Sequence, residues 1–344
     1  MPAPYPLIRG IVLAVGLAVP LAAHAADPAL VQAATKEGSV SWYTSLVANQ
    51  TVRPLTAAFE KKYPGIKVDA TVGGGTDLDV KVRLEGQAHT MHADVYHGGS
   101  AIGGLKAQGL IEPYFPESAR HFPPEMKDAE GYWTAEVVNV YVAAVNTDLV
   151  SPADEPKTLA DLLKPRWKSQ IALTNSLTQG GAAGFVGSVM LTMGNDAGLD
   201  YLKKLSPQLV SVPANVRVVL DQVIAGQYPM AIMTAVNHSV ISKKQGAPIK
   251  WLKLEPAVQT LDTVFLLKGA PHPNAGKLLI DFLVSREGQE VFRDASSIPA
   301  DPDVPPLDSD TRPDRGGFKA VVLKPELVEK ELPGWVDIYN KLLK

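Results

Sequence analysis

The sequence predicts an α/β protein in which sheets are flanked by helices. Short runs of β-branched and apolar residues alternate with segments whose apolar residues recur every three or four positions. This alternation is typical of sheets covered by helices on both faces. The chain has 344 residues, a length that suggests roughly two domains. Hydrophobic residues make up 46 % of it, as in ordinary globular proteins.

The first 25 residues have the order of regions found in a secretory signal peptide. Arg9 is followed by an apolar run over residues 11–21 and then by the small-x-small pattern Ala23-His24-Ala25. As a helix this run covers only about 16 Å, too short for a bilayer core of roughly 30 Å. We therefore expect cleavage after Ala25 and an exported protein located in the periplasm.

The remaining elements follow from local pattern. Short apolar, β-branched runs predict strands, and apolar residues three and four apart predict the helices between them. A segment rich in Pro and Asp is expected to form an extended surface loop before a last helical region. The expected strands are 40–44, 66–71, 93–97, 137–145, 171–173, 230–233 and 263–267, the clearest helices are 55–63, 184–193, 216–225 and 275–284, and the loop is 297–317.

Residues 78–84 fit two patterns. Apolar and charged residues alternate there, which by period alone indicates a strand. The pattern Thr76-x-x-Asp79 resembles a helix-opening capping arrangement, and Leu78 and Val82 are helix neighbours. We favour a helix.

Composition and motifs exclude several function classes. The net charge of −3 argues against nucleic acid or an anionic membrane as a partner, because both attract basic surfaces. The chain has no cysteine, so disulfides, thiolate metal sites and Cys nucleophiles are ruled out. It contains no nucleophile elbow and no glycine-rich phosphate-binding fingerprint. We expect neither an enzyme nor a cofactor.

Small and polar residues follow the predicted strands. In open α/β sheets, ligands bind beyond the carboxyl ends of strands, where glycine allows close approach and helix N-terminal N–H groups can hold an anion. Any one of these loops could be an ordinary turn, but four at equivalent places favour a polar binding cleft. The residues concerned are Thr44, Ser45, Gly75, Thr76, Ser100, Thr178, Gly180 and Gly181.

Three histidines and an arginine are further candidates for a functional role. The spacing His89-x-x-His92 could chelate a metal, but no nearby residue completes a set, so exposed histidines are expected and no metal site is predicted. His97 ends a predicted strand and is expected to face the cleft. Arg217 lies near the start of a predicted helix, where it could be a solvated side chain or pair with an anion.

The chain resembles family 1 extracellular solute-binding proteins of ABC importers, and within them the ferric-iron-binding periplasmic branch. The resemblance covers nearly all of the chain after residue 25. It rests on the order and spacing of several segments, which match those of the family; each segment alone has low specificity. These segments are 38–44 (GSVSWYT), 59–68 (FEKKYPGIKV), 93–95 (ADV), 145–147 (VNT), 159–168 (LADLLKPRWK), 268–275 (KGAPHPNA) and 282–289 (FLVSREGQ).

This resemblance implies the type II periplasmic binding protein fold, with two α/β lobes joined by two crossover strands. The first lobe is expected to comprise residues 26–138 and 265–344, and the second residues 139–264. A bound ligand would close the lobes by a hinge and present them to an ABC permease in the inner membrane. The protein is expected to act as a monomer.

The resemblance also implies where a ligand would be held. Iron-binding relatives carry two adjacent tyrosines at positions that fall here on Val236 and Asn237, so iron is not the expected ligand. Asn215, Arg217, Asn237 and His238 of the second lobe would face the polar residues of the first, and the expected ligand is a small phosphorylated or carboxylated anion. A ferric-binding protein, a periplasmic enzyme on the same fold and a receptor that serves a sensor kinase remain alternatives.

Overall fold

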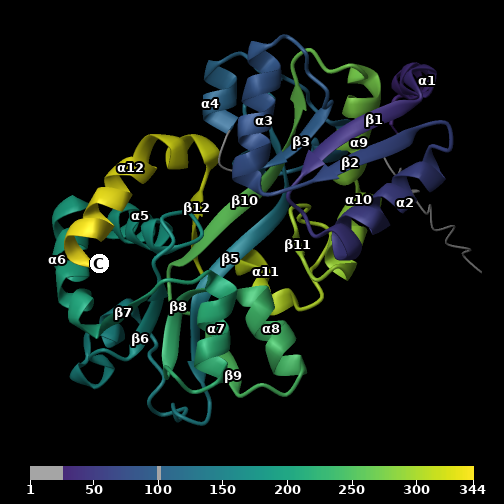
Figure 1. The fold of residues 1–344 in the computed structure, drawn as a ribbon. Helices are drawn as coiled ribbons and strands as arrows, with labels where there is room; N and C mark the ends of the chain where they lie inside the picture. Colours follow the sequence, from purple (N-terminus) through teal and green to yellow (C-terminus); the bar gives the residue numbers. More distant parts are fainter. Residues whose placement is uncertain (1–25, 99–101) are drawn as a thin grey trace, which may run out of the picture.

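The computed structural model describes residues 26–98 and 102–344. The predicted signal peptide and Ser100 lie outside these residues. Within the described ranges the α/β prediction is confirmed: strands and helices alternate along the chain (Figure 1). In the same ranges, no helix combines the length and apolar character needed to cross a membrane.

The strands form one continuous sheet. Its main path runs β2-β1-β3-β10-β5-β8-β6-β7, and four short or peripheral strands pair with β5 or β10. Each of the seven strands expected from the sequence is present. The strands are β1 (Ser39–Thr44), β2 (Lys67–Val72), β3 (Val95–Gly98), β4 (Ile111–Glu112), β5 (Thr134–Asn146), β6 (Ile171–Thr174), β7 (Leu209–Val212), β8 (Met230–Ala235), β9 (Ile249–Leu252), β10 (Ala257–Leu267), β11 (Ile298–Pro299) and β12 (Ala320–Leu323).

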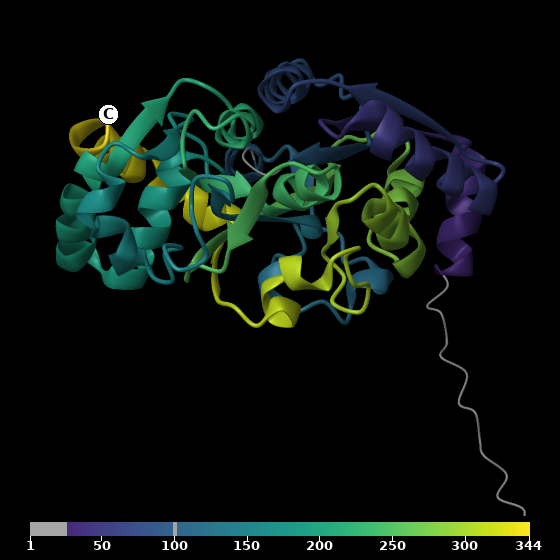
Figure 2. The same cartoon turned by 90° about the horizontal axis from the view of Figure 1, so that it is seen from below.

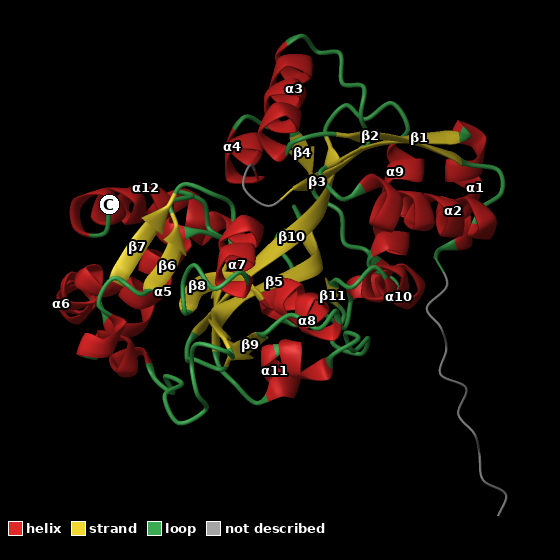
Figure 3. Ribbon diagram, turned by 60° about the horizontal axis from the view of Figure 1, so that its bottom comes forward, coloured by secondary structure: helices red, strands yellow, loops and turns green. Residues whose placement is uncertain are grey.

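Helices pack around the strands at both ends of this sheet (Figure 3). Residues 78–84, which fit both a strand and a helix pattern, lie in helix α3. Leu78 and Val82, four positions apart, are buried on one face of this helix. The helices are α1 (Pro28–Glu37), α2 (Arg53–Lys62), α3 (Gly75–Gln87), α4 (Ile102–Ala107), α5 (Ala182–Met193), α6 (Asn195–Leu205), α7 (Val216–Ile224), α8 (Val236–Lys244), α9 (Pro273–Leu283), α10 (Arg286–Asp294), α11 (Pro313–Gly316) and α12 (Pro325–Leu342).

Strands β5 and β10 connect the two halves of the molecule. They are 13 and 11 residues long and pair antiparallel through most of their length. The large apolar core that contains Val142 belongs to the first half, whereas Ala143 already belongs to a second core. On β10 the residues from Leu261 onward that lie in a core belong to the first one, whereas Val258 belongs to the second and Ala257 again to the first. The lobe boundaries predicted at 138/139 and 264/265 stay predictions.

The C-terminal helix does not stay with the first half. The predicted division assigns residues 265–344 to the first lobe, but Trp335 and Tyr339 of α12 are buried in the second core, and α12 packs against α5. Figure 1 shows the C-terminus beside α5 and α6. The chain therefore crosses between the halves a third time, through β12, which pairs with β10.

The segment 297–317 is mostly loop, as expected, but it is not simply a surface loop. It contains β11, a one-turn 3₁₀ helix and α11. The Arg312 side chain is 4 % exposed and donates hydrogen bonds to the carbonyl groups of Pro299 and Asp301. A buried guanidinium holds the segment together, which composition alone did not indicate.

Candidate functional site

The first predicted loop lies at the end of β1. Thr44 is buried, and its Oγ1 accepts a hydrogen bond from the Leu46 N–H at 3.2 Å. Its carbonyl accepts from Gly73 N–H at 3.1 Å, which joins the loops after β1 and β2. Ser45 is exposed beside it. The structure thus brings the polar ends of two parallel strands together.

Helix α3 begins in the second loop with a free N-terminus. Its N-cap residue Gly74 supplies no side-chain acceptor, so the first N–H groups, near Gly75 and Thr76, lack a side-chain cap. The predicted capping role of Asp79 is wrong, because its carboxylate accepts a hydrogen bond from the Tyr96 hydroxyl. Burial raises the pKa of Asp79 although that hydrogen bond opposes the shift.

His97 lies at the end of β3, but its ring is buried against an acid. The side chain is 3 % exposed and its Nδ1 contacts the Glu136 carboxylate. Burial by itself would lower the pKa of His97, but the charge of Glu136 and the hydrogen bond to it outweigh burial and raise that pKa. Asp262 lies near enough to act in the same direction. His97 supports the surface of the candidate site from within the sheet.

The second half contributes the loop between β6 and α5. The hydroxyl groups of Ser176 and Thr178 lie 3.1 Å apart, and Gly181 N–H donates to the Thr178 carbonyl at 3.0 Å. Gly181 is the N-cap of α5 and offers no side-chain acceptor. Gly180 lies against the hydroxyl of Tyr141, because a Cβ built there would be 2.3 Å from that oxygen.

Helix α7 differs because it caps itself. The side-chain Oδ1 of the N-cap residue Asn215 accepts from the N–H groups of Arg217 and Val218, both at 3.0 Å. The Arg217 guanidinium pairs with Asp221, four residues later, at 2.7 Å and donates to Ser242 Oγ at 3.1 Å. Both predicted residues are therefore engaged within the protein. An exposed pair of this kind is weak and can be exchanged for another anion.

Helix α8 begins where the family's tyrosine pair would stand. Val236 is buried, and Asn237 lines a pocket of about 300 Å³ between α8 and residues 296–311. Burial, with Arg217 nearby, lowers the pKa of His238 and keeps its imidazole neutral. Among the described residues, Nδ1 of His238 has no hydrogen-bond partner. The N-cap residue Ala235 has no side chain that could cap the helix.

Strand register places both sets of loops at one stretch of β5. Gly98, at the end of β3, is opposite Thr263 of β10, which is itself opposite Ala135. Ala235, at the end of β8, is opposite Tyr141. The span from Ala135 to Tyr141 is about 20 Å of extended strand. In Figure 1, α3 lies on one side of β5 and β10, and α7 and α8 lie on the other.

Three side chains on this stretch were missed by the sequence analysis. Asn139, Tyr141 and Asp262 are the partly exposed positions of β5 and β10, two strands that are otherwise buried. Their register puts them on one face, since Asn139 is opposite Thr260, two residues from Asp262. We call these three residues the central surface. The sequence offered one signal for them: Asn139 and Tyr141 are polar residues two positions apart within an apolar run, a spacing that places both on the same face of a strand.

The central surface carries both a phenol and an acid. Burial, and then the charge of Asp262, raise the pKa of Tyr141 to about 12, so its hydroxyl stays protonated and can donate a hydrogen bond. The Asp262 carboxylate can accept one. Together with the helix N-termini of α3 and α8, which lack a side-chain cap, the site offers donors at its rims and an acceptor at its centre.

Comparison with known proteins supports this architecture. Residues 89–320 match the family model of bacterial extracellular solute-binding proteins. The Fe(3+)-binding periplasmic protein of Serratia marcescens is 24 % identical over 76 % of this chain and 78 % of its own, and a putative 2-aminoethylphosphonate-binding periplasmic protein of Salmonella typhimurium is 28 % identical over 80 % of each.

A solved structure gives the fold independently. The fructose-6-phosphate-bound periplasmic binding protein AfuA of Actinobacillus pleuropneumoniae superimposes with a TM-score of 0.70 at 22 % identity, covering 89 % of this chain and 98 % of its own. The two-lobed periplasmic binding protein fold expected from the sequence is thereby confirmed. The family is one of solute-binding proteins rather than of enzymes. This chain belongs to the bacterial extracellular solute-binding proteins.

Proposed function

We propose that this periplasmic solute-binding protein of an ABC transporter captures a small organic anion, phosphorylated or carboxylated, between its two lobes and delivers it to a permease. The observation that carries the proposal is the set of three helices, α3, α5 and α8, that begin at the carboxyl edges of the strands without a side-chain cap. At α5, two of the first N–H groups, those of Ala182 and Gly184, already donate to the carbonyl groups of Ser176 and Thr178, so α3 and α8 carry most of the argument. Uncapped N–H groups and the helix dipole together favour negative charge.

The two lobes supply different parts of such a site. Gly75 and Thr76 present the N-terminus of α3, while Thr178, Gly180 and Gly181 present that of α5. Ser45 would add an exposed hydroxyl group from the first lobe, beside the buried Thr44. The three guanidinium nitrogens of Arg217 donate hydrogen bonds to Asp221 and Ser242, and the remaining N–H groups can donate to a ligand. Asn215, Asn237 and His238 complete the proposed set, and His97 lies beneath it, buried against Glu136.

The acid on the central surface narrows the ligand class. Asp262 would repel a bare anion placed against it, because like charges at short range are unfavourable. A ligand with its anionic group at a helix N-terminus and a hydroxyl or amino group near Asp262 satisfies both ends. Hydroxylated phosphates and aminophosphonates have this form. The relative from Salmonella typhimurium and the solved structure of AfuA carry such ligands in their names.

A thermal-shift screen tests the proposal. Phosphorylated sugars, phosphonates and carboxylates are compared with neutral sugars and amines. A ligand at a hundred times its dissociation constant stabilises the folded state by about 2.7 kcal/mol, which raises the melting temperature by a few degrees. Hits among the anions only are expected. Hits confined to neutral or cationic compounds would overturn the proposal.

A charge placed on α3 identifies the site. Thr76→Asp adds a carboxylate at the exposed start of α3, which suits the helix dipole but repels a bound anion. Affinity should fall at least about ten-fold, or 1.4 kcal/mol, with no loss of stability. The matched control is Asn195→Asp, which makes the same change at the start of α6. Equal loss in both variants would remove α3 from the site.

Iron is the second candidate, since one relative is named for it. Val236 and Asn237 offer no phenolate where the ferric proteins are expected to carry two, and Tyr141 is held protonated. We expect no strong phenolate-to-iron charge-transfer band when ferric citrate is added. A band with one-to-one iron uptake that disappears in Tyr141→Phe would show that the central surface binds iron instead.

A further inference from the structure

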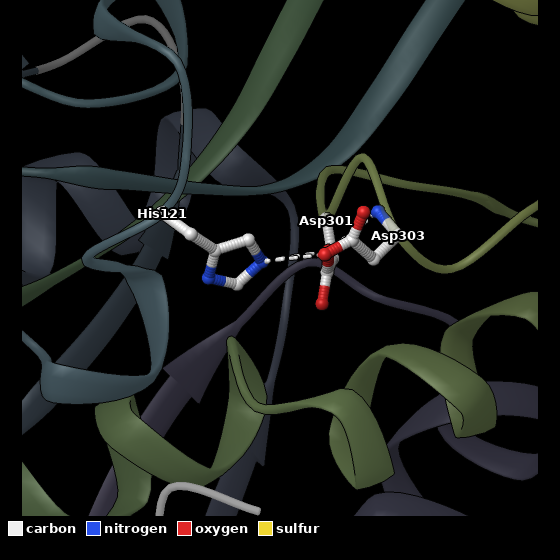
Figure 4. Close-up of side chains that lie close together, drawn as sticks. All are labelled: His121, Asp301 and Asp303. Carbon is white, nitrogen blue, oxygen red and sulfur yellow. Dashed lines mark hydrogen bonds and ion pairs between the residues drawn. The ribbon is translucent and has the colours of Figure 1, made fainter. Parts of the chain in front are cut away.

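A cluster of three metal-ligating side chains lies outside the candidate site. His121 follows the one-turn 3₁₀ helix Glu117–Ala119, and Asp301 and Asp303 follow β11, 180 positions later than His121. Figure 4 shows the imidazole pointing at the two carboxylates. In Figure 2 the neighbouring α11 lies on the side of the crossing strands away from α3.

The geometry points to a site for one divalent transition ion of the zinc class, and we propose that His121, Asp301 and Asp303 bind it. His121 Nε2 is 2.9 Å from Asp301 Oδ1 and 3.8 Å from Asp303 Oδ2, and the three ligand atoms all lie within 4.8 Å of one another. Zinc bonds to nitrogen and oxygen are about 2.0–2.2 Å, which places neighbouring ligands about 3–4 Å apart.

The buried ligand is held in place before any ion arrives. Asp301 is 4 % exposed, its N–H donates to Gln289 Oε1 at 3.0 Å, and its carbonyl accepts from Arg312 at 2.8 Å. The Arg312 guanidinium forms its ion pair with Asp314, at 3.0 Å. The carboxylate of Asp301 is therefore oriented by the backbone around it and faces His121.

The other two ligands are open to solvent, so an ion can enter. His121 is 43 % exposed and Asp303 is 73 % exposed. The Asp303 N–H donates to Asp301 Oδ1 at 2.8 Å, a tight turn that brings the second carboxylate back to the same imidazole nitrogen. A simple His–Asp hydrogen bond would not need that second carboxylate.

The donor set decides the class of ion. One imidazole nitrogen and two carboxylate oxygens suit Zn²⁺ or a similar transition ion, whereas Ca²⁺ and Mg²⁺ take oxygen ligands. Two carboxylates neutralise the charge of a divalent ion, and three protein ligands leave one position for water. The ion would bridge the loop at His121 and the segment that begins at Asp301. This bridge does not depend on ligand capture between the lobes.

Zinc titration of the untagged, metal-stripped protein by calorimetry tests the site. One equivalent should bind, and the melting temperature should rise with zinc. His121→Gln and Asp303→Asn should each weaken binding at least about ten-fold while leaving the melting temperature in chelator unchanged. Asp310→Asn, an exposed acid of the same segment, is the matched control and should bind zinc like the wild type.

Three outcomes would overturn the proposal. Absence of saturable binding by the wild type is the first, and equal affinity in all four proteins is the second. The third is loss of binding in a His89→Ala, His92→Ala double variant with retention in His121→Gln, which would place the ion at those exposed histidines. A Thr76→Asp protein should bind zinc normally, so failure of the anion proposal and failure of this one are separable.

Discussion

The buried pair of His97 and Glu136 shows how one residue can serve the site without facing a ligand. Its position at the end of β3 suggested a ligand contact, but an imidazole that is 3 % exposed against a carboxylate cannot reach solvent. The sequence correctly predicts that His97 lies at the end of a strand. Its partner Glu136, 39 positions away, could not be predicted because no local pattern links the two residues. The same limit applies to Asp79, whose partner is Tyr96 rather than the helix terminus.

The pair makes stability depend on pH. Because the folded-state pKa of His97 is raised, its contribution is complete below about pH 6.5, the unfolded value, and is lost as pH rises through the folded value. Each unit of displacement contributes about 1.4 kcal/mol. Glu136→Gln removes the carboxylate and with it this contribution.

Urea unfolding of both proteins between pH 5.5 and pH 9 measures the effect. The stability of wild type relative to Glu136→Gln should decrease as pH rises. An exposed histidine, His92, gives the control variant His92→Gln, which should follow the wild type. Parallel pH profiles for wild type and Glu136→Gln would show that the pair does not titrate in this range.

At the scale of elements, local periodicity was sufficient for strands and helices but not for their partners. The helix predicted for residues 78–84 is confirmed as part of α3, because Leu78 and Val82 are spaced for one helix face. The packing of α12 on α5 could not be predicted from the sequence. Each helix carries an apolar face, but no local pattern indicates which lobe the face of α12 contacts. The central surface was missed for the same reason: the register of β5 on β10 joins residues more than a hundred positions apart.

The contact between α5 and α12 depends on a glycine. A Cβ built on Gly187 would lie 2.6 Å from the ring of Trp335, which is buried. Gly187→Ala should therefore destabilise the protein by about 1–3 kcal/mol through overpacking. Gly334→Ala, on α12, has no atom within 4 Å of the new Cβ and should be neutral or stabilising by up to about 1 kcal/mol. Thermal unfolding of the two variants compares them directly.

A lower melting temperature for both variants would mean that α12 is strained near Gly334 as well. An unchanged melting temperature for Gly187→Ala would mean that the indole moves aside at little cost, and that α12 is held to the second lobe mainly by its other apolar residues. Either result bears on why the segment after residue 324 belongs to the second core.

For the whole molecule, the described residues form three apolar cores along one sheet, and the crossing strands pass between them. On β5 the first core ends at Val142 and the second begins at Ala143; on β10 Leu261 belongs to the first core and Val258 to the second. A register shift lies beside each change, at Val142/Ala144 and at Asp262/Thr263. Bulges of this kind bend strands locally. We therefore expect the crossing strands to flex at these points when the lobes close.

Ligand-driven closure is the prediction that tests this arrangement. A ligand that contacts the N-termini of α3 and α5 binds the closed form better than the open one, and this difference in affinity shifts the population. The radius of gyration measured by small-angle scattering should fall when a hit from the thermal-shift screen is added, and should stay constant in Thr76→Asp at the same concentration. A ligand that binds tightly and leaves the scattering curve unchanged would contradict closure while leaving capture of the solute intact, because binding in one lobe alone needs no movement of the crossing strands.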